Sequence, residues 1–136
     1  MVIRYLLDTN TASYVIKGNM PSVRDQLVKV PIAEVGISVI TEAELLFGVA
    51  RLPDALSLKV VVEEFLLRVE ALPWDSEAAK HYAQLRAGLE KKGQPMGNLD
   101  TMIAAHALAL GLVLVTGDRV FRRVSGLKIE DWSKPA

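Results

Sequence analysis

Four acidic residues of this sequence stand where an apolar run ends or a helical pattern begins: Asp8, Glu44, Asp100 and Asp118. Asp8 directly follows the apolar run VIRYLL, and Asp118 comes shortly after the run LVLV. Carboxylate oxygens are the ligands that Mg²⁺ and Mn²⁺ prefer in proteins. If the fold brings the four side chains together, a divalent cation would offset their mutual repulsion. The acids are therefore candidate metal ligands.

Each acid, taken alone, is better explained by the local needs of a helix. Asp8 and Asp118 belong to a residue type that is favoured as the N-cap of a helix. Thr41 and Glu44 have the spacing of a capping box, in which two side chains satisfy free backbone N–H groups. Asp100 falls in a predicted first turn, where the helix dipole stabilises negative charge. A metal site thus depends on whether the acids converge.

The apolar runs predict the elements that would bring the acids together. Short runs rich in Val, Ile and Leu, separated by helical patterns, are typical of buried parallel strands in an α/β fold. We predict strands at residues 2–7, 35–40, 69–74, 112–115 and 127–129. We predict helices at residues 54–70, 76–93 and 98–111. In such a sheet every strand ends at the same edge, where ligands bind, so all four acids would line that edge.

Asp75 and the helix predicted at residues 54–70 each have two interpretations. Asp75 follows the third predicted strand and could join the acids, but it would only cap a helix if that strand lies at the end of the sheet. In the predicted helix, Leu56, Val60 and Leu67 widen the apolar stripe beyond one packed face. These three residues could form a partner surface, and we favour their burial in the core.

The composition excludes several other classes of protein. The 136 residues suffice for one domain with its own core, and 51% of them are hydrophobic. Lys+Arg and Asp+Glu both number 16, so the chain does not bind nucleic acid by overall charge. The absence of cysteine excludes disulfides and Cys-ligated zinc. No apolar run has the length of a membrane helix and no signal peptide is evident, so we expect a soluble cytoplasmic protein.

Histidine and tryptophan offer little alternative chemistry. His81 and His106 lie in predicted helices without the H-E-x-x-H spacing of a zinc site, which favours structural roles. Trp74 and Trp132 are expected to anchor packing rather than to stack on bases. The sequence contains neither a G-x-S-x-G nucleophile elbow nor a G-x-x-x-x-G-K phosphate loop. Metal-bound carboxylates remain the main candidate chemistry.

Four motifs, taken together and in order, resemble the PIN-domain ribonucleases: LLDTN, ISVITEAELLFGV, GNLDTMIAAHALALG and LVTGDRVFRRVSGLKIEDW. Within that family they are most similar to the VapC toxins of bacterial and archaeal toxin–antitoxin pairs. The resemblance implies a single PIN domain over residues 1–136, with a three-layer α/β fold around a five-stranded parallel sheet. It also implies an endoribonuclease dependent on Mg²⁺ or Mn²⁺, which cuts tRNA or rRNA loops and so inhibits translation. Its expected partners are a VapB-type antitoxin and a second copy of the chain.

The resemblance assigns roles to individual residues. Asp8 matches the acid of the L-D-T-N motif, and Glu44 matches that of T-x-x-E-L-x-x-G, with Glu42 ranked second. Asp100 matches the acid of D-x-x-I-A-A-H-A, and Asp118 matches the least uniform acidic position. These acids would bind one or two metal ions that activate water. The residues expected to orient them are Thr9, Asn10 and Thr116. An RNA substrate also needs positive charge, for which the candidates are Lys17, Arg51, Arg119, Arg122 and Arg123.

Two other classes of function use similar features. A Mg²⁺-dependent phosphohydrolase of the haloacid-dehalogenase type would need D-x-D after the first strand, where this chain has Asn10. A receiver-like phosphoacceptor domain would need paired acids there and a phosphorylated Asp further along, and the order of acids fits poorly. A non-catalytic PIN-like interaction module is the remaining alternative, and the presence of all four acids argues against it.

Overall fold

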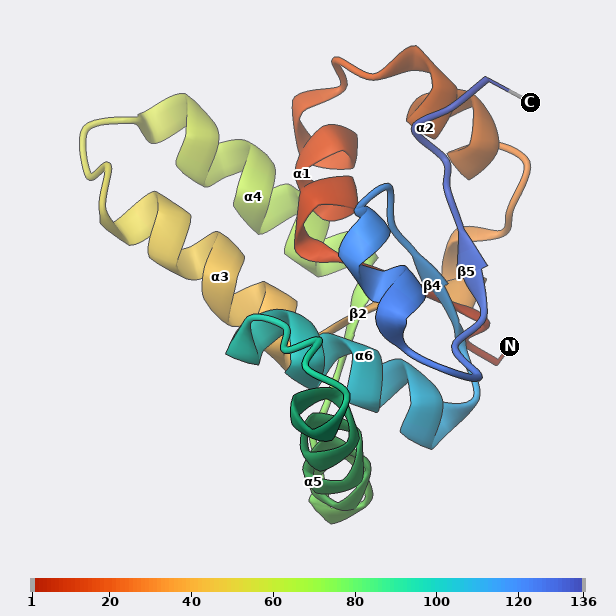
Figure 1. Cartoon of the computed structure of the whole chain (residues 1–136). Coiled ribbons are helices and arrows are strands. Elements are labelled where there is room, and N and C mark those ends of the chain that lie inside the picture. Colours follow the sequence, from red (N-terminus) through yellow and green to blue (C-terminus); the bar gives the residue numbers. More distant parts are fainter. Residues whose placement is uncertain (1, 136) are drawn as a thin grey trace.

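The structure, a computed structural model, describes residues 2–135. Five strands form one parallel sheet in the order β3-β2-β1-β4-β5, which confirms the predicted α/β fold (Figure 1). Within these described residues, two short 3₁₀ helices, η1 and η2, accompany six α-helices. In chain order the elements are β1 (Tyr5–Leu7), α1 (Thr9–Lys17), α2 (Pro21–Leu27), η1 (Ile32–Glu34), β2 (Val35–Ser38), α3 (Val39–Ala50), α4 (Leu56–Arg68), β3 (Glu70–Leu72), α5 (Ser76–Lys91), α6 (Asn98–Leu110), β4 (Val113–Val115), η2 (Arg119–Arg123) and β5 (Ile129–Glu130).

Successive residues of the central strand β1 pack on opposite faces of the sheet. Leu6 contacts the apolar cluster that contains Ile103 of α6, whereas Leu7 contacts the cluster that contains Ala12 of α1 and Val62 of α4. Helices α1, α2 and α4 therefore cover one face, α6 covers the other, and α5 packs against α6 (Figure 1). Because β1 is buried on both faces, its sequence is apolar rather than alternating.

Helices α3 and α4 form a hairpin whose turn extends away from the sheet (Figure 1). Only one side of α4 faces the core, where Val62 is 3% exposed. The burial expected for the other apolar residues of α4 is wrong, because Leu56, Val60 and Leu67 are 68%, 53% and 87% exposed. A helix on the outside of the domain buries one stripe, and these residues lie beyond it.

Several element boundaries differ from those predicted. The strand expected at 35–40 ends at Ser38, whose Oγ accepts a hydrogen bond from the Ile40 N–H at 3.0 Å and so caps α3. The capping box expected at Thr41 and Glu44 is therefore wrong, since both residues lie inside α3. The remaining predicted strands and helices are present but shorter, and the ranges of α1, α2 and α3 had not been predicted.

Both tryptophans contribute to packing, as expected. The ring of Trp132 lies 5.5 Å from that of Tyr5, and the ring of Trp74 lies 6.0 Å from that of Tyr82, measured between centroids. Trp74 also donates from Nε1 to the carbonyl of Met102 at 3.0 Å. Since Trp74 follows β3 and Met102 belongs to α6, this bond ties α6 to the end of the sheet.

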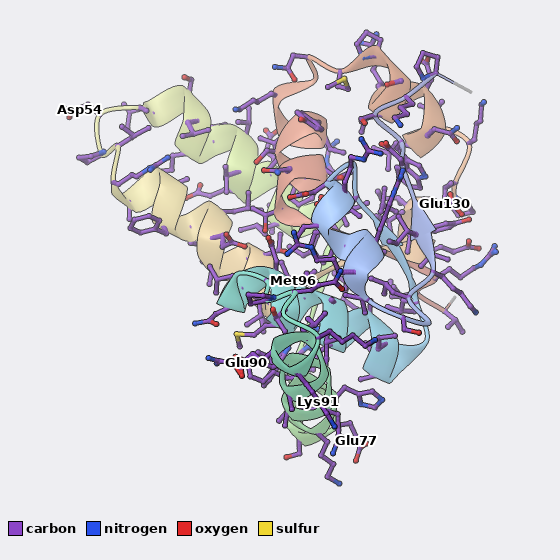
Figure 2. All side chains as sticks on the ribbon, viewed as in Figure 1. Asp54, Glu77, Glu90, Lys91, Met96 and Glu130 are labelled. Carbon is purple, nitrogen blue, oxygen red and sulfur yellow. The ribbon has the colours of Figure 1, made fainter. Side chains whose placement is uncertain are left out.

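Charged side chains dominate the outer surface of α5, where Glu77, Glu90 and Lys91 point away from the domain (Figure 2). Asp54 lies at the tip of the α3–α4 turn, distant from the sheet (Figure 2). Among residues 2–135, no helix combines the length and the apolar character needed to cross a bilayer.

Candidate active site at the carboxyl edge of the sheet

Asp8 connects the ends of the two central strands. It follows β1 and is the N-cap of α1, where Oδ1 accepts a hydrogen bond from the Thr11 N–H at 2.8 Å. Its other oxygen, Oδ2, accepts a hydrogen bond from the Thr116 hydroxyl at 2.6 Å, directly after β4. Burial raises the pKa of Asp8, and the hydrogen bonds from Thr116 and Thr11 counter only part of that rise. Asp8 is thus both a helix cap and a buried carboxylate with a fixed orientation.

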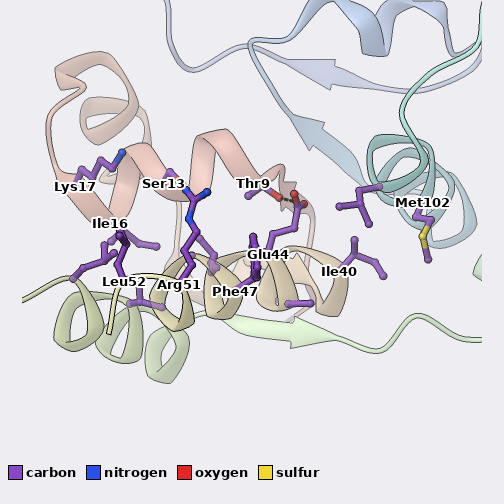
Figure 3. Close-up of a pocket in the computed structure, with 16 residues that line it drawn as sticks. Thr9, Ser13, Ile16, Lys17, Ile40, Glu44, Phe47, Arg51, Leu52 and Met102 are labelled. Carbon is purple, nitrogen blue, oxygen red and sulfur yellow. Dashed lines mark hydrogen bonds between the residues drawn. The ribbon is translucent and has the colours of Figure 1, made fainter. Parts of the chain in front are cut away.

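Glu44 lies in the second turn of α3 and faces the start of α1. Its Oε1 accepts a hydrogen bond from the Thr9 hydroxyl at 2.6 Å (Figure 3). The hydroxyls of Thr9 and Thr41 are 3.2 Å apart, and because the Thr9 proton goes to Glu44, Thr41 is the donor of that bond. Glu42 is two residues earlier on the helix and therefore points in a nearly opposite direction. The geometry favours Glu44 over Glu42, as the sequence suggested.

Asp100 lies in the first turn of α6 and is half-buried. Burial raises its pKa, and the negative charges of Asp118, Glu44 and Asp8 raise it further. All three of those charges act on Asp100 because they lie around the same edge of the sheet. The structure therefore places the four acids that the sequence singled out along one edge of the sheet.

Asp118 is the most exposed of the four acids. It caps η2, with Oδ1 accepting from the Val120 N–H at 3.0 Å, and its own N–H donates to Oγ1 of Thr116 at 3.0 Å. Thr116 thus contacts both Asp8 and the Asp118 backbone. Of the three residues expected to orient the acids, Thr9 contacts Glu44 and Thr116 contacts Asp8. Asn10 is exposed at the start of α1.

The loop that carries Asp118 is supported by the end of the chain, which the sequence did not indicate. A Cβ at Gly117 would lie 2.9 Å from Oγ of Ser133 and 3.2 Å from Oδ1 of Asp131. A larger residue at this position would require the Ser133 hydroxyl to move, so the segment after β5 packs closely against the loop between Thr116 and Asp118. In the sequence, Gly117 itself was the signal that could have indicated this contact with the segment after β5.

The donor set fits a hard divalent cation. The ion pairs found within residues 2–135 join other residues, so the four acids lack a basic partner there. In their present orientations, no three acidic or histidine side chains of the described residues are close enough to share one ion. The carboxylates surround a common region without converging on a point, and side-chain rotation would be needed to ligate a cation together.

Asp75 is a cap outside this group. It follows β3, the strand at the end of the sheet, and its Oδ1 accepts a hydrogen bond from the Ala78 N–H at 3.1 Å. The sheet order thus resolves the two interpretations that the sequence left open for Asp75.

The basic candidates fall into two groups around the acids. Arg119, Arg122 and Arg123 belong to η2, directly after Asp118, but Arg123 donates to the Pro95 carbonyl at 2.8 Å and so holds the loop before α6. Lys17 and Arg51 lie at the ends of α1 and α3 and line the same groove as Glu44 (Figure 3).

A groove leads from Glu44 toward Lys17 and Arg51. It has a volume of about 710 Å³, and its walls come from α1, α3, α4 and the start of α6 (Figure 3). Phe47 is 64% exposed on this groove, and the Arg51 guanidinium lies 5.7 Å from its ring centroid. The groove is acidic at one end, mostly apolar in the middle and basic at the other end.

The parallel five-stranded sheet and the acids at its carboxyl edge characterise this class of α/β protein. Comparison with known proteins identifies the family. A family model of the PIN domain matches residues 5–127. The chain is 40% identical over 132 residues to "tRNA(fMet)-specific endonuclease VapC" of Salmonella typhimurium, covering 96% of this chain and 99% of the relative. It is 38% identical to the protein of the same name from Shigella flexneri, covering 97% of this chain and all of the relative.

A solved structure supports the same assignment. DNA-bound VapBC from Salmonella typhimurium superposes with a TM-score of 0.89 at 40% sequence identity, covering 96% of this chain and 99% of that chain. The chain therefore belongs to the PIN-domain family, and within it to the VapC ribonucleases. The family that the sequence motifs resembled is confirmed.

Proposed function

We propose that this chain is an endoribonuclease dependent on Mg²⁺ or Mn²⁺, acting as the toxin of a VapBC-type pair. The observation that carries the proposal is the group of four carboxylates at one sheet edge, without a basic partner among the described residues. Hydrolysis of RNA phosphodiester bonds would then inhibit translation. Membership of the VapC ribonucleases supports the nuclease class.

The site residues divide the work as follows. A divalent ion held by Asp8, Glu44, Asp100 and Asp118 would activate water and stabilise the charge that develops on the phosphate. Thr116 and the Thr11 N–H hold the Asp8 carboxylate in one orientation, and Thr9 does the same for Glu44. The pKa values of Asp8 and Asp100 are raised, mainly by burial, which suits a carboxylate that takes a proton from the attacking water.

Initiator tRNA is the first substrate to test. The two relatives at 40% and 38% identity carry the name tRNA(fMet)-specific endonuclease, which supports a tRNA rather than an rRNA target. A single-stranded loop would expose the bond to be cut. Arg119 and Arg122 of η2, and Lys17 and Arg51 along the groove, are the proposed phosphate contacts. Arg123 is less available because it holds the Pro95 carbonyl.

A VapB-type antitoxin is the proposed protein partner. The solved structures of the relatives from Salmonella typhimurium and Rickettsia felis are of VapBC assemblies. We place a segment of the antitoxin in the groove beside Glu44, because the groove combines an apolar middle with charged ends. A homodimer also remains a proposal, and the molar mass of the purified chain in solution would test it.

The decisive experiment compares the full chain with two site variants. Asp8→Asn and Asp100→Asn should lose cleavage of transcribed initiator tRNA, and chelation by EDTA should stop the parent. Hydrolysis by water predicts a 5′-phosphate and a 3′-hydroxyl at the cut, so a 2′,3′-cyclic phosphate would contradict the mechanism. If both variants cut RNA and arrest cells as the parent does, the chain is not a nuclease of this type.

A further inference from the structure

His106 is a buried residue that the proposed reaction does not use. It is 1% exposed, and its Nδ1 lies 2.9 Å from Oγ of Ser38. Its other nitrogen, Nε2, has no hydrogen-bond partner within residues 2–135, although the Pro73 carbonyl is near enough to affect the ring. A buried polar atom without a hydrogen-bond partner lowers the stability of the fold, so its presence needs an explanation.

We assign the direction of the bond between His106 and Ser38 from the surroundings of the ring. Oγ of Ser38 already accepts a hydrogen bond from the Ile40 N–H, as the cap of α3. Burial lowers the pKa of His106, while Asp75 and the Pro73 carbonyl oppose that change only in part, so the ring is neutral. With its proton on Nε2, toward Pro73, the ring accepts at Nδ1 the proton of the Ser38 hydroxyl.

This bond joins the two helices that carry acids of the site. Ser38 is the last residue of β2 and caps α3, whose second turn carries Glu44. His106 lies on α6, six residues after Asp100, which is about 9 Å further along the helix axis. Helices α3 and α6 are in contact (Figure 1). The bond from His106 on α6 to Ser38, the N-cap of α3, joins them.

We propose that His106 is a positioning residue of the metal site, which acts through Ser38 to set the orientation of α3 relative to α6. The inference rests on the proposed function, because it concerns the separation of Glu44 and Asp100 as metal ligands. The negative charges of Glu44 and Asp100 repel each other when no cation is bound. A fixed contact behind the acids resists that repulsion. Changes in groups that orient metal ligands typically reduce metal affinity by about 10–100-fold.

Two substitutions at His106 separate positioning from simple packing. In His106→Asn, the amide oxygen can replace Nδ1 and accept from Ser38. In His106→Gln, the longer side chain places its amide nearer to the position of Nε2 and loses the bond to Ser38. His81→Gln is the matched control, because His81 is a partly exposed histidine whose ring is hydrogen-bonded to the Glu77 carbonyl of its own helix.

Calorimetric titration of the full chain with Mn²⁺, without RNA, gives the first readout. We expect His106→Gln to raise the Kd for Mn²⁺ about 10-fold or more, and His106→Asn and His81→Gln to stay close to the parent. If His106→Gln fails to fold, His106→Leu removes the same bond without affecting the Ser38 cap of α3 and should raise the Kd similarly. Equal affinities in the Asn and Gln variants, whether parental or reduced, would overturn the inference.

A second readout does not depend on metal. The chain has no cysteine, so spin labels at Leu46→Cys on α3 and Leu110→Cys on α6, both about half exposed, report the distance between the helices. His106→Gln should broaden or shift that distance, and His106→Asn should leave it unchanged. A parent that binds no Mn²⁺ would refute the proposed function. The spin-label distances would still decide whether His106 holds the helices, and an unchanged distance in His106→Gln would refute that.

Discussion

The hydroxyl of Thr116 donates a hydrogen bond of 2.6 Å to Oδ2 of Asp8, across 108 residues of sequence. The same hydroxyl oxygen accepts from the backbone N–H of Asp118 at 3.0 Å. One threonine therefore holds a buried carboxylate and the loop that carries a second one. The parallel pairing of β1 with β4 makes this possible, because it places the ends of both strands side by side.

Thr116→Val should destabilise the fold and impair the site. The substitution preserves the shape of the 2% exposed side chain but leaves the Asp8 carboxylate and the Asp118 N–H without their partner. Buried groups left unpaired cost about 1–3 kcal/mol, so the free energy of unfolding in urea should fall by that amount. Thr116→Ser keeps the hydroxyl and should lose less than half as much. An equal loss in both variants would show that the methyl group, not the hydrogen bonds, matters.

Asp100→Asn should stabilise the metal-free chain at neutral pH while abolishing cleavage. Asp100 is half-buried beside three other acids, and its pKa is raised by burial and by their charges. The uncharged amide avoids both penalties, so the melting temperature in EDTA should rise by a few degrees, at about 4 °C or less per kcal/mol for a chain of this size. Asp75→Asn is the control, since an asparagine can still cap α5 and the melting temperature should not rise.

The stability of the metal-free chain should depend on pH in a direction set by the raised pKa of Asp100. A pKa raised above the ordinary value of 3.8 means that the folded state favours protonated Asp100. This stabilisation is complete below pH 3.8 and is lost as the pH rises through the folded-state pKa. Subtracting the unfolding free energy of Asp100→Asn from that of the parent, at each pH in EDTA, isolates the effect. The difference should become less favourable to the parent as pH rises, and a flat difference would contradict the raised pKa.

Binding of Mn²⁺ or Mg²⁺ should stabilise the parent. A ligand that binds only the folded state at 100 times its Kd adds about 2.7 kcal/mol, which a thermal melt resolves. The gain should be absent in Asp8→Asn, because Asp8 is the acid whose orientation is fixed by two hydrogen bonds. A melting temperature that does not respond to either metal in the parent would remove the support for a metal site.

Phe47→Ala should weaken binding of the antitoxin more than it weakens RNA cleavage by the free chain, because the Phe47 ring also lies beside Arg51. Phe47 is 64% exposed on the groove, so its removal costs little folding stability, whereas aromatic side chains at the centre of interfaces often dominate affinity. We expect the Kd for the antitoxin to rise about 10-fold or more. Leu67→Ala removes an even more exposed apolar side chain of α4 outside the groove and should leave the Kd unchanged. Equal effects of the two variants would exclude the groove as the binding site.

The exposed residues of α4 mark a limit of sequence reasoning. The apolar periodicity of residues 54–70 correctly indicated a helix, but periodicity does not say how much of a helix is covered. The helix lies on the outside of the domain, so only the stripe around Val62 is buried. The capping box predicted at Thr41 and Glu44 is absent because Ser38, three residues before Thr41, is the N-cap of α3.

The sequence by itself indicated the approximate positions of the strands, singled out the four acids as candidate site residues and pointed to the family to which the chain belongs. These features are local, since strands, caps and motifs are written in the types and spacing of neighbouring residues. Only the tertiary structure decided that Asp75 is a cap alone, because that depends on the place of β3 at the end of the sheet. It alone paired His106 with Ser38, 68 residues away, and Thr116 with Asp8. Such contacts depend on which strands become neighbours, and no local pattern of residues specifies that order.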